Sequence, residues 1–341
     1  MKKLVILLML LSLTGCYDYI EIDDLVILTG IILDYKDNNI EMISEITENN
    51  NESKTYKTTC TNINECISKL SVLSNKRVYL SHLKVLLLTE NIINNDINYY
   101  DYFLRDPHNK MNFYIYLIDS KDKDNVFNNK NTSIYINDLT NLNSDISSYT
   151  SKLTFIDLIH KRFEYGIDPI YPVLHIDDNI KLKDLKVNDI LIESNDVIFY
   201  NMLISNIKEA YLTIPCEEEN FTLLINKLNT NYNFNEETLT ININLKGRID
   251  NYNCQYNISN KDTTKVLTNE SNKYINEKTN EIINLSKNNN YDFIGLGNYI
   301  YKHNKNYFDF ENYNWNNKLN DLKTNINVNT IITSIGESRK W

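Results

Sequence analysis

Short apolar runs of strand length alternate with stretches whose apolar residues recur every three or four positions, and this alternation constrains the fold most. Residues 25–33 form a continuous β-prone run, and residues 83–89 form another. Between these runs, one set of apolar residues has the spacing of a helix face. That set comprises Ile63, Cys66, Ile67 and Leu70. Because strands and helices interleave, the chain is predicted to be a mixed α/β protein and not a repeat array.

The same alternation continues through the first third of the chain. Residues 38–39 supply a turn before a second strand at residues 40–47, which predicts a strand pair. A second amphipathic helix is predicted to end before Pro107, because proline disfavours helix at the preceding residue. Its apolar face comprises Ile93, Ile97, Tyr100 and Leu104. Residues 111–118 predict another strand, and the polar residues 128–148 predict a loop with room for a short helix.

The middle of the chain carries further helix and turn signals. Thr150 and Ser151 are predicted to cap a helix that ends before Gly166. Its apolar face comprises Leu153, Ile156, His160 and Phe163. Residues 189–199 are predicted to form a hairpin around residues 194–196. A later helical stripe comprises Phe221, Leu224, Ile225 and Leu228.

From residue 236 onward the pattern restarts. Residues 238–249 alternate apolar and polar side chains regularly, which predicts a half-buried strand. Residues 262–286 carry the spacing of a long amphipathic helix, and residues 325–335 alternate like a final strand. Strand, long helix and returning strand predict a separate C-terminal domain.

The predicted fold class is therefore α/β (mixed α+β), with three modest domains. Each domain is expected to be a small mixed or antiparallel sheet packed with helices. A chain of 341 residues is too long for one small core. The expected divisions are a leader at 1–15, an N-terminal α/β domain at 16–185, a small middle domain at 186–235 and a C-terminal α/β domain at 236–341.

The first sixteen residues have the form of a bacterial lipoprotein signal. A short basic start precedes an apolar run at residues 4–13, and Leu-Thr-Gly-Cys follows at residues 13–16. The apolar run is shorter than the ~20 residues that a membrane-spanning helix needs. We therefore expect export, cleavage before Cys16 and lipid attachment at its thiol. The alternative is an ordinary secretory leader with an incidental cysteine.

The charge balance also points to a lipid tether. The chain has 45 acidic and 35 basic residues, a formal net charge of −10. Anionic lipid surfaces should repel such a chain, and nonspecific nucleic-acid binding needs clustered Lys and Arg. Since no polybasic stretch flanks Cys16, two or more acyl chains would have to supply stable anchoring.

Residues with chemical potential are few and dispersed. Export would permit disulfides among Cys60, Cys66, Cys216 and Cys254, although buried free thiols are the favoured interpretation. No Cys-x-x-Cys pair or zinc spacing occurs, and a glycine pair at residues 295–297 lacks the third glycine of a nucleotide loop, so no metal or cofactor is expected. Hydrolase motifs are missing too, and no catalytic residue is assigned.

Three residues are candidate contacts with a protein partner. Arg105 and Asp106 could meet a partner, but a charged helix end with a local ion pair is the favoured interpretation. Trp315, near several tyrosines, could lie at an interface, where aromatic residues are enriched. A position in the core or at its edge is favoured for it.

Five blocks of sequence, in this order, resemble the Ger(x)C family, the C-subunit lipoproteins of spore germinant receptors. The blocks are residues 15–18 (Gly-Cys-Tyr-Asp), 21–30 (ending in Thr-Gly), 82–87, 103–107 (with Arg-Asp) and 292–297 together with Trp315. The chain departs from the family pattern at Tyr17, where tryptophan is usual, and lacks the basic residues usual after Asp18. The Pro and Trp often found before Trp315 are also missing.

The resemblance implies a lipid-anchored receptor subunit on the outer face of the spore inner membrane. Its implied partners are an A and a B membrane subunit, and the complex would respond to small nutrients such as amino acids or sugars. The implied fold is three α/β domains without enzymatic activity. The competing hypotheses are a solute-binding lipoprotein of a transporter, which needs two lobes of repeated βαβ units, and an exported hydrolase, which is the least favoured.

Overall fold

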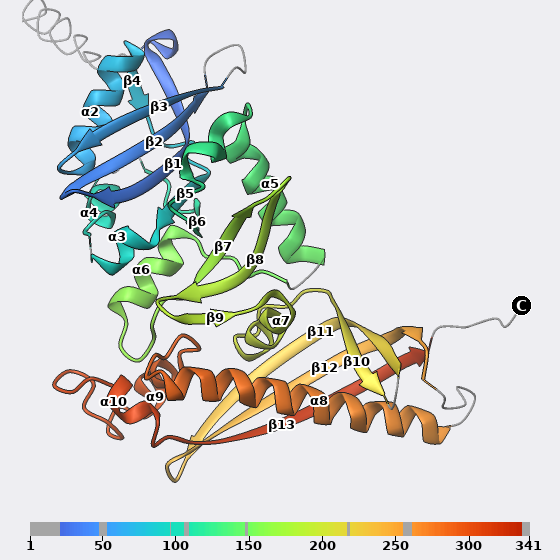
Figure 1. Ribbon diagram of the computed structural model, residues 1–341. Coiled ribbons are helices and arrows are strands. Elements are labelled where there is room, and N and C mark those ends of the chain that lie inside the picture. The colour runs from blue at the N-terminus through green and yellow to red at the C-terminus, as the bar shows by residue number, and fades with distance from the viewer. Residues whose placement is uncertain are drawn as a thin grey trace, which may run out of the picture.

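The computed structural model describes residues 21–47, 53–95, 97–105, 109–146, 149–216, 219–254 and 261–335. Figure 1 shows two sheets, one in the N-terminal part of the chain and one in the C-terminal part, with helices packed on both. The mixed α/β fold class is thereby confirmed. Cys16 with its leader, and Asp106, lie outside the described residues.

The larger sheet has nine strands in the order β3-β2-β1-β5-β6-β7-β8-β9, with β4 beside β1. Its centre is parallel from β1 through β5 and β6 to β7, and its wings are antiparallel. The central strands are continuous apolar runs because both of their faces are covered. The strands are β1 (Leu25–Lys36), β2 (Asn39–Thr47), β3 (Ser53–Cys60), β4 (Arg77–Tyr79), β5 (Val85–Thr89), β6 (Tyr114–Ile118), β7 (Tyr171–Ile176), β8 (Ile180–Val187) and β9 (Ile190–Ile192).

Helices cover both faces of this sheet, as Figure 1 shows with α2, α3 and α4 on one side and α5 on the other. Ile63 of α2 and Phe103 of α4 join one apolar cluster, whereas Ile136 of α5 and Phe127 of η2 join a second. The elements are η1 (Ile22–Asp24), α2 (Ile63–Ser74), α3 (Glu90–Asn94), α4 (Tyr100–Arg105), η2 (Lys123–Asn128), α5 (Thr132–Ile146) and α6 (Phe155–Phe163).

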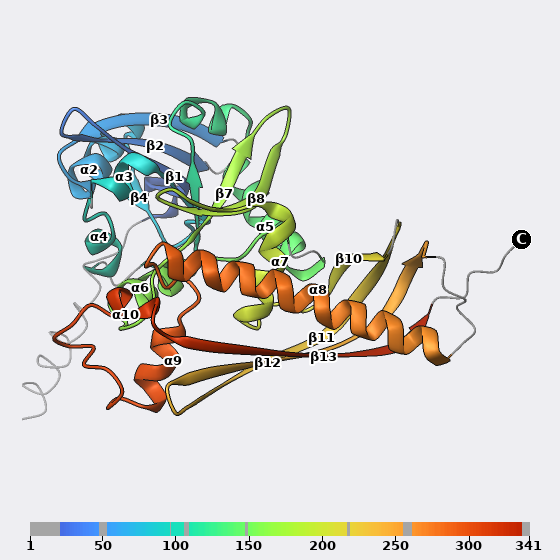
Figure 2. The same ribbon diagram turned by 60° about the horizontal axis from the view of Figure 1, so that its bottom comes forward.

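The smaller sheet has the order β10-β11-β12-β13 and is antiparallel except for the parallel pair β12 and β13. Figure 2 shows the long helix α8 crossing over its strands. One buried apolar cluster includes residues of both sheets and of α7, so the two sheets share a core. The elements are α7 (Ser194–Leu203), β10 (Ala210–Cys216), β11 (Glu219–Asn235), β12 (Thr238–Tyr252), α8 (Lys261–Asn288), α9 (Leu296–His303), α10 (Asn316–Leu319) and β13 (Lys323–Ile335).

The two internal domain limits expected from the sequence fall inside a strand and at a turn between paired strands. The limit at 185/186 lies inside β8, which pairs with β7 and β9. The limit at 235/236 lies at the tight turn between β11 and β12, where Glu236 and Glu237 have positive φ. β10 and β11 thus share a sheet with β12 and β13. The division into three domains stays a prediction.

Residues 132–146, expected within a polar loop, form the helix α5. The N-terminus of α5 is capped by the carboxylate of Glu45 from β2. Glu45 is buried and accepts the backbone N–H of Thr132 at 2.9 Å and that of Ser133 at 2.7 Å. A negative charge at a helix N-terminus satisfies otherwise unpaired N–H groups and complements the helix dipole. Since the capping residue is distant in sequence, no local signal marks the start of this helix.

Two predictions in the middle of the chain are wrong. The hairpin expected at residues 189–199 is β9 followed by α7, whose residues 197–203 are all buried and so show no amphipathic period. The helical stripe that begins at Phe221 lies in β11, a strand with bulges near Leu223 and Lys227. A bulge changes which side chains face the core, and this can imitate helical spacing.

Two helix boundaries also differ from the expectation. The second amphipathic helix is two short helices, α3 and α4, and the side chain of Asn98 accepts the N–H of Asp101 where the second begins. The helix expected after Thr150 begins at Phe155, because Thr154 and Asp157 form a capping box. His160, which was expected on the apolar face of this helix, is exposed.

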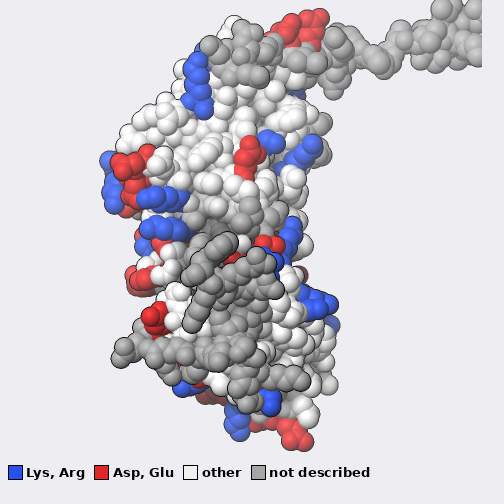
Figure 3. Space-filling model, turned by 90° about the vertical axis from the view of Figure 1, so that its right-hand side faces the viewer, with Lys and Arg blue, Asp and Glu red and all other residues white. Residues whose placement is uncertain are grey.

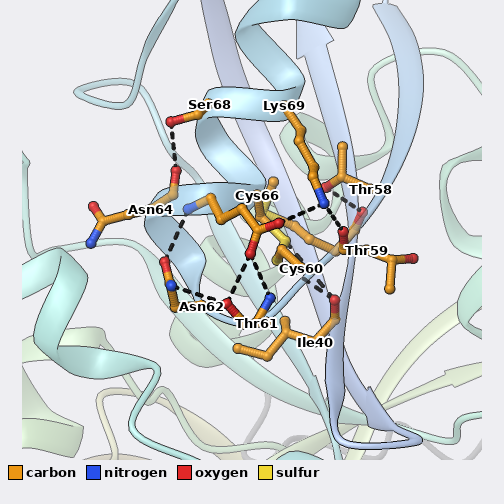
Figure 4. Close-up of a disulfide and its surroundings, with 12 residues drawn as sticks. Ile40, Thr58, Thr59, Cys60, Thr61, Asn62, Asn64, Cys66, Ser68 and Lys69 are labelled. Carbon is orange, nitrogen blue, oxygen red and sulfur yellow. Dashed lines mark hydrogen bonds and ion pairs between the residues drawn. A yellow bond between two sulfur atoms is a disulfide. The ribbon is translucent and has the colours of Figure 1, made fainter.

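The expectation of free thiols is wrong, because the four described cysteines form the disulfides Cys60–Cys66 and Cys216–Cys254. The first joins the end of β3 to the first turn of α2 (Figure 4). The second joins the end of β10 to the segment after β12. The alternative that export permits, an oxidised chain, is therefore the one that the structure shows.

We expect the two disulfides to contribute unequally to stability. Cys216 and Cys254 close a loop with a sequence separation of 38, against 6 for Cys60 and Cys66. Replacing both members of a pair by Ser should therefore lower the free energy of unfolding by ~4 kcal/mol for the long loop and ~2.4 kcal/mol for the short one. Urea unfolding of the two double variants measures this, and equal losses would contradict the loop argument.

Candidate functional site

A polar cavity of about 570 Å³ lies where the parallel strands β5, β6 and β7 end. Ligands of open α/β sheets bind in the crevice outside the carboxyl ends of the strands, so the position is that of a candidate binding site. Its lining includes Asn91, Ser120, His175, Asp184, Lys186 and Leu191.

Two pairs of ionisable side chains face each other in this cavity. Nζ of Lys186 lies 2.5 Å from Oε1 of Glu90, and Nε2 of His175 lies 2.9 Å from Oδ2 of Asp184. The hydroxyl of Ser120 accepts a hydrogen bond from Asn91 at 3.2 Å. A nucleophilic serine needs a base as its partner, whereas here the partner is an amide. The cavity thus offers hydrogen-bonding groups that are already held by their neighbours.

A buried ion cluster bonds to Asn91 of the cavity lining. The ammonium of Lys123 contacts the carboxylate of Asp34, which is 3% exposed, and lies 2.7 Å from Glu41. Asp34 also accepts hydrogen bonds from Thr89 at 2.6 Å and from Asn91 at 2.9 Å. Burial works to raise the pKa of Asp34, but the bonds from Lys123, Thr89 and Asn91 outweigh it and hold that pKa below its ordinary value. The cluster fixes Asn91, which lines the cavity.

A second constellation surrounds Asp292, which is fully buried. Its Oδ1 accepts the backbone N–H groups of Gly295 at 2.8 Å and Leu296 at 3.0 Å, and its Oδ2 accepts that of Gly297 at 2.7 Å. The indole N–H of Trp315 donates to Oδ2 at 2.9 Å. One carboxylate therefore satisfies the N-terminus of α9 and fixes the tryptophan that follows α9.

The Asp292 constellation also binds the segment that follows α6. The backbone N–H of Asp292 donates to Oδ2 of Asp168 at 2.8 Å, and that of Asn298 donates to the carbonyl of Gly166 at 2.6 Å. A Cβ on Gly297 would lie 2.3 Å from Nε1 of Trp315, and Gly166 has a φ of +70°. Glycine at both positions allows the backbones to approach this closely. Residues far apart in sequence are thereby joined.

The predicted partner residues occupy different surroundings. Arg105 is exposed and forms an ion pair with Asp101 at 2.6 Å, one turn earlier in α4, which agrees with the favoured local interpretation. Trp315 is 4% exposed and stacks on Phe310 at 5.2 Å between ring centroids, so its burial supports the core interpretation. Their contact with a partner stays a prediction, and Asp106 and Cys16 lie outside the described residues.

From the sequence, Asp292 was named only within the family block at residues 292–297, and Asp168 and Glu45 were not identified as structurally important residues. The available signal was an acidic residue among apolar or glycine neighbours, because a buried carboxylate must find hydrogen-bond donors.

The described residues offer little for a metal site, a membrane-spanning helix or a nucleic-acid surface. No group of three or more His, Cys, Asp or Glu side chains among them is arranged to hold a metal ion. In the part of the chain that the structure describes, no helix is long and apolar enough to cross a membrane. On the face in Figure 3, basic and acidic side chains are intermixed over the described surface. This view gives no support to a nucleic-acid surface.

Replacing Asp292 by Ala should destabilise the protein strongly. The change leaves three backbone N–H groups and the indole of Trp315 without their acceptor in a buried site. We expect a loss of ~4 kcal/mol in the free energy of unfolding. Asp309→Ala is the matched control, because the Asp309 carboxylate is exposed and bonds only to the nearby Glu311 and Asn312, and it should change stability little. Similar urea midpoints for both variants would refute the role of Asp292.

The pH dependence of stability should report the burial of Asp292. Burial raises its pKa from 3.8 to about 6, against the opposing effect of the N–H groups that donate to it. Between these pH values the folded protein keeps a proton that the unfolded chain has released. This contribution to stability is present below the ordinary pKa and is lost as the pH rises through 6. The difference in unfolding free energy between wild type and Asp292→Asn should therefore shrink from pH 4 to pH 7, and a growing difference would oppose it.

Comparison with known proteins finds two family models that match successive parts of the chain. A family model described as "Spore germination protein N-terminal domain" matches residues 18–176, and one described as "Spore germination B3/ GerAC like, C-terminal" matches residues 191–336. Among curated proteins, no match is found.

A solved structure described as "Crystal Structure of the GerBC protein" is similar in fold. Its TM-score is 0.56 at 13% sequence identity, and the alignment covers 93% of this chain and 100% of that one. At this identity the likeness shows the fold, while the two family models match strands of both sheets. The chain therefore belongs to the GerAC-like family of spore germination proteins, the germinant receptor C subunits that its sequence resembles.

Proposed function

We propose that this protein is the lipid-anchored, non-enzymatic C subunit of a nutrient germinant receptor in the spore inner membrane. The observation that carries the proposal is the match to both family models together with Leu-Thr-Gly-Cys at residues 13–16. The Leu-Thr-Gly-Cys segment is the basis for the proposed lipid anchor, and the family is the basis for the proposed role in germination.

The start of the fold supports an anchor close to the membrane. Ile22, at the start of η1, follows Cys16 by six positions in the chain, and a link of this length spans at most ~21 Å. A diacylated cysteine at this point would hold the large sheet near the outer leaflet. The formal net charge of −10 leaves this attachment to the acyl chains.

A structural rather than catalytic role agrees with the described geometry. The buried groups of the family block, Asp292 and Trp315, bond to each other and to the backbone. In the cavity, Ser120 and Lys186 are likewise held by neighbouring side chains. We infer that the subunit works through contacts with an A and a B membrane subunit, without a cofactor.

A solute-binding lipoprotein of a transporter is the alternative, and only the cavity beside His175 favours it. Such proteins bind solute between two lobes of βαβ units. Here the second sheet is mostly antiparallel, and one apolar core joins it to the first. The receptor subunit accounts for more of the structure.

Complementation of a gene deletion tests the proposal. Spores that lack the protein should germinate slowly with particular nutrients but normally with calcium dipicolinate. Wild-type protein should restore the response, whereas Cys16→Ala should remain an unprocessed precursor and fail to restore it, because it has no thiol for the lipid. Arg105→Ala is the control variant and should restore germination if its exposed ion pair is local. Normal germination of the deletion strain with every nutrient would overturn the assignment.

A further inference from the structure

The C-terminal end of α2 presents an apolar tip to solvent. The side chain of Val72 is 81% exposed and that of Leu73 is 55% exposed, which makes Val72 the most exposed large apolar residue in the described part of the chain. The opposite face of α2 is buried through Ile63, Cys66 and Leu70. The tip is therefore not part of the core, although the helix that carries it is firmly packed.

Several covalent and polar links fix α2 to β3 (Figure 4). The disulfide between Cys60 and Cys66 joins the two elements, and Nζ of Lys69 donates to the carbonyl of Thr59 at 2.6 Å. At the start of the helix, the side chain of Asn62 accepts a backbone N–H of the first turn. A rigid support of this kind keeps the exposed tip in one place, as a docking surface requires.

The tip lies at the same end of the molecule as the start of the fold. Leu25 pairs with Arg77 at the beginning of the parallel strands β1 and β4, which lie ~4.8 Å apart. Arg77 follows Val72 by five residues, a span of at most ~18 Å. Figure 1 shows α2 and β4 together at the end of the molecule remote from α8. An anchor at Cys16, whose link to Ile22 is short, must therefore lie on this side.

Basic residues follow the tip in the sequence, and the acidic residues Asp23 and Asp24 of η1 precede the strand β1 that pairs with β4. Lys76 and Arg77 follow the apolar pair after two polar residues, and long basic side chains can extend toward headgroups while their stems lie on apolar surface. Lys69 is paired with Glu65 at 2.7 Å, so no acidic excess faces the tip from α2 itself. Two apolar side chains cover far less than the roughly 800 Å² per partner of a stable protein interface.

We propose that the end of α2, with Val72 and Leu73, inserts into the headgroup and acyl boundary of the membrane and forms a second, non-covalent contact beside the lipid anchor. The proposal rests on the anchored subunit proposed above. The apolar faces of interfacial helices are buried in this boundary to a depth of ~5–10 Å. One anchor alone leaves the body free to rotate, whereas two contacts fix the orientation of the large sheet.

The test is quenching of a new tryptophan by lipids with brominated acyl chains. Val72→Trp and the control Ile331→Trp are prepared as full, lipidated chains in vesicles of phosphatidylethanolamine and phosphatidylglycerol. Ile331 lies on β13 and is 54% exposed, so the control matches Leu73 in exposure but is far from the anchor. Relative to the parent chain, Val72→Trp should lose emission in brominated vesicles, and Ile331→Trp should not.

A second preparation separates this proposal from that of the natural anchor. Residues 16–341 without lipid are coupled through the Cys16 thiol to a maleimide lipid, and the same quenching is measured. If the coupled Val72→Trp protein is quenched but the natural protein carries no lipid, the docking surface is supported and the native anchor is refuted. Equal emission of both variants in brominated and ordinary vesicles, with the protein attached, overturns the surface. A blue-shifted emission at position 72 without bromine quenching indicates a protein contact and overturns it too.

Discussion

The buried carboxylate of Asp292 is the interaction on which the connection between the two halves of this protein depends. Burial of a carboxylate is costly, and it is tolerated here because four N–H groups converge on its two oxygens. Through its own backbone N–H, Asp292 also reaches Asp168, from the segment after α6. The cost of burial thus secures a specific contact between segments far apart in sequence, where an apolar contact would tolerate sliding.

The same principle recurs in the large sheet, where carboxylates from β1 and β2 organise elements of the opposite side. Glu45 caps the N-terminus of α5. Asp34 bonds to Lys123, Thr89 and Asn91 and so holds these three side chains together. Apolar packing covers the faces of the sheet, while these buried acids set which residues come to its carboxyl edge. The cavity at that edge is consequently lined by side chains that already bond to one another.

Local patterns in the sequence sufficed where a segment has one buried face. The spacing of Ile63, Cys66 and Leu70 predicted α2, and regular alternation predicted β12 and β13. Prediction failed where the deciding partner is remote or where every face is buried. The cap of α5 comes from Glu45, α7 is apolar all round, and the bulges of β11 shift its periodicity. The disulfides were not predicted, because the pairing of cysteines depends on the fold and not on their spacing in sequence. Around Asp292, the block was visible but its hydrogen bonds were not.

The strand order of the small sheet has a consequence for how the protein matures. β13, which ends at Ile335, pairs in parallel with β12, and α8 lies between these strands in sequence. Until this last strand arrives, one edge of β12 has no neighbour in the sheet. The small sheet can therefore close only after β13 has been made, whereas the strands of the large sheet all come earlier in the chain.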